Sequence, residues 1–476
     1  MSQFSEYLKT LVEESGSSVS ALARAAGLNR PNLQNVIGGS RKPARGDVEK
    51  LLPHLRVSAE QRERLLELLE GELLGEDIVE RRAYVQALLE RMDQSFRATP
   101  VAHRTTAASG DFRETELFSG NAAIHGALVQ LLAEGAARGG TLAVFPGFPT
   151  EWLRFCLSVL WGLEGQAMEV VQFQEFWKAP QAAACTANLD MLSVALPLLL
   201  NGQVPYELRY TYAAHIEPTH PHQLFPFCLV FPQAVFLLHR NGEQAMVLRE
   251  QAVLRCWQEA ARTMRSDARP LFNKDFDTLG ILRYYNGVDT QPHRFGFLES
   301  QPCLVPYADP EILDRLFCPE IPQREAMARE VLAYAALLRE QPYIGLFYEE
   351  GLRLFAETGF IRDLPQGYSV PASPDIRRTV LERLYEDCAG EKHTLRIAKP
   401  WRLRLPQDVV VAVREYVGTH FVLPVGQSNQ YCNIQVDEAT ITEAFLDFIT
   451  AMACSDAVYT KEETLEMIRR AVESLT

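Results

Sequence analysis

Residues 30–35 bring together polar side chains that are suited to contact the edges of nucleic-acid bases. Arg30 carries a guanidinium group that can pair bidentately with guanine. Asn32, Gln34 and Asn35 carry amides, and Asn or Gln can pair in the same way with adenine. These residues can read a DNA sequence if a helix presents them to the major groove.

Three basic residues, Arg41, Lys42 and Arg45, follow within a few positions. Point charges on a loop suit phosphate groups, which fix the register of a protein on DNA but carry no sequence information. The alternative is a solvated basic loop on a small helical bundle. DNA binding is favoured because the basic residues and the amides concentrate on one short segment.

A second group of residues with possible chemistry consists of His215, Glu217, His220 and His222. Imidazole and carboxylate groups suit zinc. However, two prolines interrupt this segment, and an unpatterned loop does not fix ligands as a helix would. The cluster is therefore a weak candidate for a metal site, and we expect no metal and no cofactor.

The sequence lacks the common catalytic motifs. It contains no GxxxxGK[ST] or GxGxxG phosphate loop, no HExxH zinc motif and no GxSxG nucleophile motif. We therefore expect that the protein is not an enzyme and that it has no catalytic residues. A metal-dependent hydrolase that uses the histidine cluster remains the less favoured alternative.

The composition is that of an ordinary globular protein, with 476 residues, 47% of them hydrophobic and 23% charged. At roughly 100–200 residues per domain, two to four domains fit this length. The longest apolar run, Leu192–Leu200, is too short to span a bilayer, and Met1–Thr10 has no apolar core of the signal-peptide type. The nine cysteines are widely spaced without a CxxC pair, which is typical of reduced thiols. We expect a cytoplasmic protein.

The net charge of −14 is unevenly distributed. Residues 1–50 hold seven Lys or Arg and five Asp or Glu, and their net charge of +2 leaves −16 for the rest of the chain. A locally basic N-terminal segment is thus attached to an acidic body, and this segment is the part that can approach DNA.

The first seventy residues predict five short helices. Apolar spacing indicates a first helix that ends at Ser15-Gly16, a second that Ser18 can cap, and a third that begins after Asn29. Gly27 lies between the second and third helices, where the chain needs a positive φ. A fourth helix is expected from Asp47 to near Pro53, and residues 58–61 form a capping box for a fifth. Two short helices joined by a glycine turn predict a helix-turn-helix.

The string SVSALARAAGLNRPNLQNVIGGSRKP, residues 18–43, resembles the phage-repressor-like helix-turn-helix family, also called the xenobiotic-response-element (XRE) family. Leu22, Gly27, Leu33 and Val36 have the spacing of that family. The sequence departs at Ile37, where many members have Glu, and at residue 31, where a polar residue is commoner than Pro. The resemblance covers about 70 residues and implies sequence-specific DNA binding.

The resemblance also implies individual roles. Base-reading positions of the recognition helix are occupied by Arg30, Pro31, Asn32 and Asn35. Contacts to the DNA backbone are implied for Ser18, Asn29, Gln34, Arg41, Lys42 and Arg45. Members of this family bind two half-sites as dimers. Residues 71–110 therefore predict a charged connecting helix or linker that either dimerises or acts as a spacer, and residues 97–111 lose helical periodicity.

Residues 111–308 alternate helical and strand patterns, which predicts a mixed α/β domain of the sensor type. Asn241-Gly242 is the strongest hairpin signal. One set of aromatic residues could line an effector pocket or fill a core; these are Phe145, Phe148, Trp152, Tyr206, Tyr210 and Tyr212. Residues 284–287, Tyr-Tyr-Asn-Gly, could form a binding loop, although a turn is favoured.

Residues 309–476 predict a mostly helical region, with capping boxes at residues 440–443 and 460–463. No internal repeat of roughly 33–47 residues is visible, which disfavours a tetratricopeptide-type solenoid. Residues 117–148 also resemble a phospholipase-D-like sensor domain. The catalytic motif of that family, His-x-Lys, is absent, because no histidine in the sequence is followed two places later by lysine.

Together these features predict a multidomain bacterial-type transcriptional regulator, with an all-α five-helix DNA-binding domain, a mixed α/β domain and a mostly helical C-terminal region. The expected partners are double-stranded DNA, a second copy of the chain and an unidentified small-molecule or protein effector. A DNA-tethered protein-interaction scaffold is the main alternative. The sequence does not specify the operator, the effector or the direction of regulation.

Overall fold

The computed structural model describes residues 2–97, 113–163, 168–178, 182–201, 205–213, 224–275, 277–287, 293–362, 364, 367–424 and 431–475. The chain divides by its internal contacts into two units. Unit 1 is Met1–Tyr84 with Gln181–Thr186, and unit 2 is Val85–Pro180 with Ala187–Thr476. None of the helices in the described part of the chain is long and apolar enough to cross a membrane.

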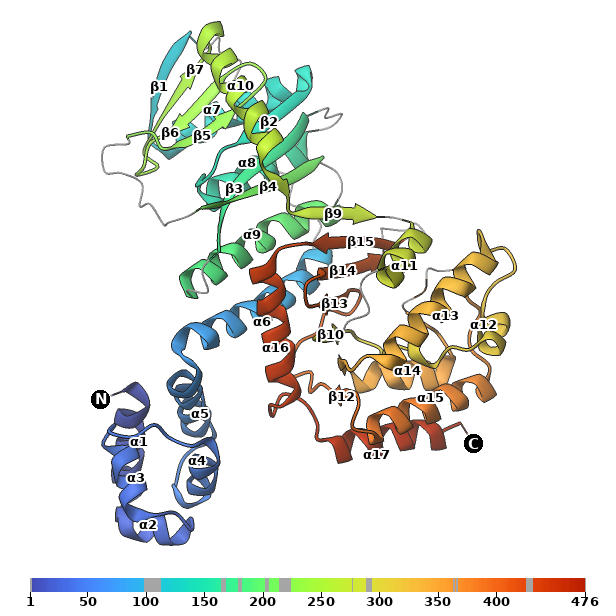
Figure 1. Ribbon diagram of the computed structural model, residues 1–476. Helices are drawn as coiled ribbons and strands as arrows, with labels where there is room; N and C mark the ends of the chain where they lie inside the picture. The colour runs from blue at the N-terminus through green and yellow to red at the C-terminus, as the bar shows by residue number, and fades with distance from the viewer. Residues whose placement is uncertain are drawn as a thin grey trace. The chain divides into compact units, whose positions relative to one another are not determined.

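Unit 1 is built from helices around one small core (Figure 1). Its elements are α1 (Gln3–Glu14), α2 (Val19–Ala25), α3 (Arg30–Ile37), α4 (Arg45–Leu51), the 3₁₀ helix η1 (Leu52–His54) and α5 (Ala59–Leu74). The five expected helices are confirmed, as is the Ser58 capping box of α5. The start of the fourth helix was predicted wrongly, because α4 begins at Arg45 after Ala44, and Asp47 lies in its first turn.

A long helix, α6 (Glu76–Arg97), follows α5 after Gly75, and the boundary between the units falls within it. Gly75 has a φ of +102°, a conformation that a side chain would strain. A Cβ there would also lie 2.5 Å from Oδ1 of Asp77. The helical connection expected after residue 71 is thus present and begins at a glycine break.

Unit 2 contains an eight-stranded sheet in its N-terminal half. The strand order is β1-β7-β6-β5-β2-β3-β4-β8. The strands are β1 (Thr115–Ser119), β2 (Gly140–Val144), β3 (Met168–Trp177), β4 (Tyr206–Ala213), β5 (Phe227–Val230), β6 (Val235–Leu238), β7 (Gln244–Leu248) and β8 (Arg269–Pro270). The helices of this half are α7 (Asn121–Arg138), α8 (Thr150–Gly162), α9 (Ala182–Asn201) and α10 (Gln251–Asp267). The predicted hairpin is confirmed, because Asn241-Gly242 joins β6 and β7.

A seven-stranded sheet lies in the second half, with the order β12-β11-β10-β13-β14-β15-β9. Its strands are β9 (Phe272–Asp275), β10 (Phe295–Leu298), β11 (Ile344–Phe347), β12 (Thr394–Ile397), β13 (Val410–Arg414), β14 (Gly418–Pro424) and β15 (Tyr431–Val436). The helical elements are α11 (Thr278–Gly287), η2 (Val305–Tyr307), α12 (Pro310–Leu316), α13 (Arg324–Glu340), α14 (Glu349–Thr358), α15 (Pro374–Ala389), α16 (Ala439–Ala453) and α17 (Lys461–Glu473).

Two local predictions in this half were wrong. Residues 284–287 form neither a loop nor an isolated turn, since they are the last turn of α11. The N-cap of α16 is Glu438, whose carboxylate accepts from the backbone N–H of Ile441 at 2.9 Å, so Thr440 is not the capping residue. The capping box of Thr460 and Glu463 at the start of α17 is confirmed.

The two sheets repeat one topology. The seven strands β1–β7 of the first sheet correspond in order to β9–β15 of the second. In each set the first strand pairs antiparallel with the seventh, as in β1 with β7 and β9 with β15. The second, third and fourth strands are parallel neighbours in both, and the second also pairs antiparallel with the fifth. An antiparallel meander completes each sheet. Unit 2 is therefore a duplicated α/β arrangement, to which β8 adds one edge strand.

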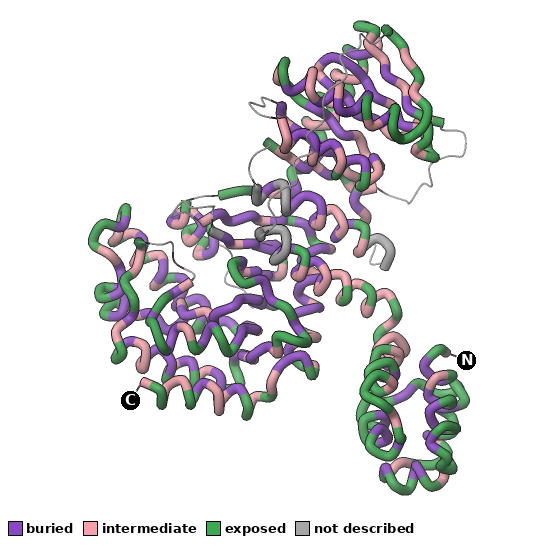
Figure 2. The backbone as a smooth tube through the Cα atoms, turned by 180° about the vertical axis from the view of Figure 1, so that it is seen from behind, coloured by how far each residue is buried: buried purple, intermediate pink, exposed green. Residues whose placement is uncertain are grey.

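Each half of unit 2 has a buried core between its sheet and its helices (Figure 2). In the first half, alternate residues of β2 point to opposite faces: Leu142 and Val144 join one core, and Ala143 joins another. In the second half one core cluster includes Phe347 and Phe355. The mixed α/β and helical regions expected after residue 111 are thus present, and both halves are organised by a sheet.

Candidate nucleic-acid interface

The segment from α2 to α3 forms a tight turn between two capped helices. Ser18 Oγ accepts from the backbone N–H of Ala21 at 3.2 Å, which caps α2. Gly27 then takes a φ of +66°, and the N–H of Leu28 donates to the carbonyl of Ala23 at 2.7 Å. Asn29 begins the next helix. The turn therefore fixes the direction in which α3 leaves α2.

Helix α3 is held by its apolar face. Leu33, Val36 and Ile37 are buried in the core of unit 1. The hydroxyl of Ser5, on α1, donates to the carbonyl of Val36 at 3.0 Å. Asn29 Oδ1 accepts from the backbone N–H of Asn32 at 3.2 Å and so caps the helix. Because three side chains and one buried hydrogen bond fix α3, its other face has a defined orientation.

The outward face of α3 carries the residues that the sequence assigned to base reading. Arg30, Pro31 and Asn35 are exposed there, and Asn32 is half-buried. Gln34, assigned to the DNA backbone, is exposed on the same helix. Helix α3 therefore brings these five side chains together at one accessible surface.

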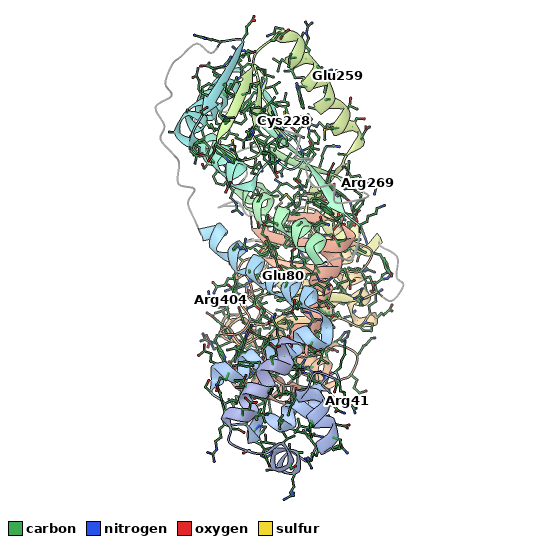
Figure 3. The ribbon with its side chains drawn as sticks, turned by 90° about the vertical axis from the view of Figure 1, so that its left-hand side faces the viewer. Arg41, Glu80, Cys228, Glu259, Arg269 and Arg404 are labelled. Carbon is green, nitrogen blue, oxygen red and sulfur yellow. The ribbon has the colours of Figure 1, made fainter. Side chains whose placement is uncertain are left out.

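The loop after α3 folds back over this surface. Gly39 has a φ of +71°, and the N–H groups of Ser40 and Arg41 both donate to the carbonyl of Asn35, at 2.9 and 3.3 Å. The exposed guanidinium of Arg41 then donates to Oδ1 of Asn32 at 2.6 Å. Figure 3 labels Arg41 among the helices of unit 1. A residue assigned to the DNA backbone and one assigned to base reading are thus hydrogen bonded to each other, which the sequence pattern did not predict.

The sequence segment that contains α3 carries charge of a single sign. No Asp or Glu occurs from Ser15 to Gly46, whereas the same stretch contains Arg24, Arg30, Arg41, Lys42 and Arg45. Asp47, on α4, lies beside this segment, at the same hollow as Asn32 and Arg41. An excess of positive charge attracts a polyanion and raises its local concentration.

Arg45 differs from the other basic residues because carboxylates already surround it. Its Nε lies 3.1 Å from Glu49 and one of its terminal nitrogens lies 3.5 Å from Glu70. Lys42 is exposed on the loop before α4. Arg45 must exchange partners to contact a phosphate.

The four residues of the weak metal-site candidate, His215, Glu217, His220 and His222, lie outside the described residues. Among the residues that are described, no three His, Cys, Asp or Glu side chains come together as metal ligands.

The six aromatic residues that could line an effector pocket or fill a core are distributed over different parts of the first half. Phe148, Trp152 and Tyr206 belong to one core, and Phe145 belongs to the core on the opposite face of the sheet. The hydroxyl of Tyr212 donates to Glu438, in the second half, at 2.8 Å. Tyr210 stacks on Phe176. These aromatic residues therefore stabilise the fold and do not line one common pocket.

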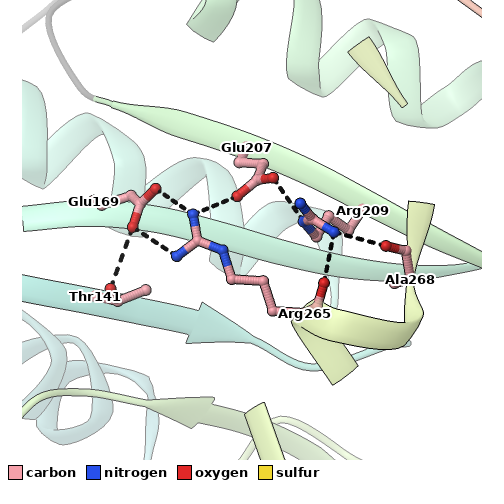
Figure 4. Close-up of polar contacts among 6 residues, drawn as sticks. All are labelled: Thr141, Glu169, Glu207, Arg209, Arg265 and Ala268. Atoms are coloured by element: carbon pink, nitrogen blue, oxygen red, sulfur yellow. Dashed lines mark hydrogen bonds and ion pairs between the residues drawn. The ribbon is translucent and has the colours of Figure 1, made fainter. Parts of the chain in front are cut away.

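An ionic network that the sequence did not reveal covers part of the first sheet (Figure 4). Arg265, near the end of α10, lies 2.7 Å from Glu169 on β3 and 2.6 Å from Glu207 on β4. Arg209 also pairs with Glu207, at 2.6 Å, and donates to the carbonyl of Ala268 at 2.7 Å. Hydrogen bonds and the charge of these carboxylates raise the pKa of Arg265. The charges are mutually neutralised, so this network joins α10 to the sheet.

Comparison with known families concerns the N-terminal helices. Residues 3–65 match the family model of a helix-turn-helix domain. These residues form a helix-turn-helix domain. The match covers α1 to the first part of α5, and α3 is the second helix of the motif. The XRE-like resemblance of residues 18–43 is thereby confirmed at the level of the domain.

The solved structures to which this chain is similar include two of low sequence identity. An archaeal chromatin protein, TrmBL2, described as having a novel mode of DNA binding, aligns at 12% identity over 57% of this chain and 94% of its own, with a TM-score of 0.23. Phosphatidylserine synthase from Haemophilus influenzae Rd KW20 aligns at 9% identity over 76% of this chain and 93% of its own, also with a TM-score of 0.23. At these TM-scores neither similarity supports a functional argument. Comparison with curated proteins gave no match.

Proposed function

We propose that this protein is a sequence-specific DNA-binding regulator of transcription. The observation that carries the proposal is the exposed polar face of α3, which belongs to a helix-turn-helix domain and lies in a sequence segment, Ser15 to Gly46, whose charged residues are all basic. In this motif the second helix enters the major groove, and its first turns meet the base edges. Residues 1–70 act as the DNA-binding domain and residues 71–110 as the connector.

Base reading belongs to the first turns of α3. Arg30 pairs with guanine, and Asn32 and Asn35 pair with adenine, while Pro31 makes an apolar contact. Contacts that position the domain on phosphates come from Ser18, Asn29, Gln34, Arg41, Lys42 and Arg45. The Arg41 side chain has to leave Asn32 before both can serve these roles, because one amide oxygen is occupied in the free protein.

The body, unit 2, senses a signal and brings two DNA-binding domains together in a homodimer. Two sheets with their own cores exceed what a dimerisation device requires. A signal acts here only if it binds one arrangement of the dimer more tightly than the other.

Selection of bound sequences from a random pool of DNA duplexes, with the full-length protein at physiological salt, tests this function. We expect enrichment of an inverted repeat, since a twofold dimer reads two equivalent half-sites. Enrichment of a single half-site would support sequence-specific DNA recognition and contradict the proposed homodimer. If no sequence is enriched while the protein unfolds cooperatively, the proposed function is wrong and the interaction-scaffold alternative gains support.

A further inference from the structure

The second half of unit 2 contains a cavity of about 170 Å³. It lies between the second sheet and the helices α11, α12, α13, α14 and α15, and apolar side chains form most of its wall. Among them are Leu304, Ile312, Leu316, Val331, Phe355 and Val380. Well-packed cores hold few voids larger than a water molecule, so a void of this size needs an explanation.

One hydroxyl at this cavity lacks a partner. Tyr285, on α11, lines the wall, is 7% exposed, and stacks on Tyr334 with 5.3 Å between the ring centroids. In the described part of the chain, Oη of Tyr285 has no hydrogen-bond partner. A buried hydroxyl without a partner is unfavourable, and a ligand oxygen in the cavity would supply one. Burial also raises the pKa of Tyr285, so the phenol stays protonated and can donate.

The charge of the wall restricts the ligand. Glu299 lies at the wall, is 2% exposed, and accepts from the backbone N–H of Cys303 at 2.7 Å. No Lys, Arg or His is among the described residues that line the cavity. The wall is mostly apolar, and transfer of an ion of either sign from water into such surroundings is costly. The cavity therefore suits an uncharged molecule.

The volume of the cavity limits the size of the ligand. An apolar cavity of roughly 150 Å³ accommodates benzene. The ligand that fits is thus about as large as one aromatic ring.

We propose that this cavity binds an uncharged molecule of single-ring size that carries one oxygen, of which phenol is the simplest. The oxygen accepts the hydrogen bond of Tyr285, and the ring fills the apolar space. Binding itself is independent of DNA, whereas the role of such a ligand as the effector rests on the proposed function.

Isothermal titration of the full-length protein with phenol and with benzene tests the site. We expect both probes to bind, and phenol to bind about fivefold more tightly because it gains one neutral hydrogen bond. In Tyr285→Phe that preference disappears while benzene binding stays within about twofold. If neither probe binds to protein that unfolds cooperatively, or if Tyr285→Phe retains the preference for phenol, the proposed site is wrong.

A cavity-filling substitution provides a second test. Ala412, on β13, lines the cavity, and Ala412→Leu places three additional carbons in it. We expect this variant to lose at least tenfold in affinity for both probes. Ala389→Leu makes the same change at an exposed position of α15 and should leave the affinities unchanged. Equal affinities in both variants would locate the probes elsewhere and overturn the assignment.

These results separate the cavity from the regulator hypothesis. If the protein binds the probes but selects no DNA sequence, the cavity site is supported and the proposed function is wrong. If it selects an operator but binds neither probe, the proposed function is supported and the cavity site is wrong. When both are present, a change in operator affinity on addition of phenol identifies the ligand class as an effector, and an unchanged affinity removes that role.

Discussion

Arg45 and Lys42 carry the same charge close together but in different surroundings. The carboxylates of Glu49 and Glu70 approach Arg45 in the free protein, whereas Lys42 is exposed on the preceding loop. A basic residue that must first leave its carboxylates gains less from a phosphate than one that is hydrated. The two residues should therefore contribute unequally to DNA binding.

Two substitutions separate base reading from phosphate contact. Arg30→Ala should cost about 1–3 kcal/mol on the selected operator and relax the choice at one base pair. Lys42→Ala should weaken binding to all sequences and reduce the salt slope by about 1, and Arg45→Ala should reduce it by less. Equilibrium binding at several salt concentrations measures both effects.

The matched control is Arg62→Ala, which removes one exposed positive charge from α5. It should change neither the specificity nor the salt slope appreciably. Equal losses on operator and random DNA for Arg30→Ala and Lys42→Ala would contradict the division of roles.

Buried His420, on β14, makes stability depend on pH. Burial lowers its pKa from 6.5 to about 4, although a hydrogen bond with Asn433 partly opposes the shift. The folded state therefore favours neutral imidazole, so this contribution to stability is complete above pH 6.5 and is lost as the pH falls toward 4. Between pH 7 and pH 5 the loss is roughly 2 kcal/mol for this one group.

Urea unfolding at both pH values measures this effect. His420→Gln should lose roughly 2 kcal/mol less than the wild type over this interval, because the glutamine does not titrate. Half-buried His125 and buried His393, whose pKa values burial also lowers, contribute equally to both proteins and cancel in the comparison. His54→Gln, at an exposed position of unit 1, is the control and should behave like the wild type. An identical pH dependence in His420→Gln would show that another group dominates.

For single residues, the sequence pattern predicts which side chains are exposed better than it predicts which side chains contact each other. Exposure of Arg30 and Asn35 follows from the apolar spacing of α3, since Leu33 and Val36 must face the core. The hydrogen bond of Arg41 with Asn32 and the ion pair of Arg45 with Glu70 depend on how the loop and α5 pack, which no local pattern encodes. The cavity at Tyr285 was missed because residues 284–287 were interpreted as a turn.

The caps of α3 and α5 allow a prediction at the level of elements. The side chains of Asn29, at the start of α3, and Ser58, at the start of α5, each accept a hydrogen bond from the backbone N–H three residues later. Asn29→Ala and Ser58→Ala should each destabilise unit 1 by about 1 kcal/mol, because each leaves a helix N-terminal N–H without its acceptor. Only Asn29→Ala should also weaken operator binding by more than its effect on folding explains.

Thermal unfolding measures the first effect, and binding at a temperature where both variants are fully folded measures the second. Ser58→Ala serves as the control, because it removes a cap from a helix without a proposed DNA contact. Equal operator affinities for the two variants would remove Asn29 from the interface.

Elements with strong local signals were predictable, and short buried strands were not. The glycine turn before α3, the hairpin at Asn241-Gly242 and the Thr460 capping box each follow from local chemistry. The second sheet was not recognised as such, since strands such as β10, Phe295–Leu298, have four buried residues and no polar alternation. Its partners are distant in sequence, and pairing between them is set by tertiary packing.

At the level of the whole molecule, the two units have separate cores. Leu8 is fully buried in unit 1 and Leu381 is fully buried in unit 2, in clusters that share no residue. Calorimetry of the full chain should therefore show at least two transitions. Leu8→Ala should lower the midpoint temperature of one transition and Leu381→Ala that of another, because such truncations typically reduce the free energy of unfolding by about 2–5 kcal/mol. A single transition that both substitutions shift would show that the units unfold together.

The duplicated topology of unit 2 is not visible as a repeat in the sequence, where no period of roughly 33–47 residues occurs. The repeated arrangement spans residues 115–248 and 272–436, so its period is much longer. It is defined by which strands pair, as in β2 with β5 and β10 with β13. Since many side-chain combinations satisfy one strand order, a topology can be repeated when no sequence period is visible.

The extended segment Arg269–Asp275 acts as a short mechanical tether. Its first two residues form β8, at the edge of the first sheet, and Phe272–Asp275 form β9, at the edge of the second. Only Leu271 separates them, and its buried N–H donates to Leu208 of β4 at 2.9 Å. A chain extends by at most about 3.6 Å per residue. The two sheet edges therefore cannot separate by more than a few ångströms before backbone hydrogen bonds break. A pulling force applied to one sheet is thus transmitted directly to the other.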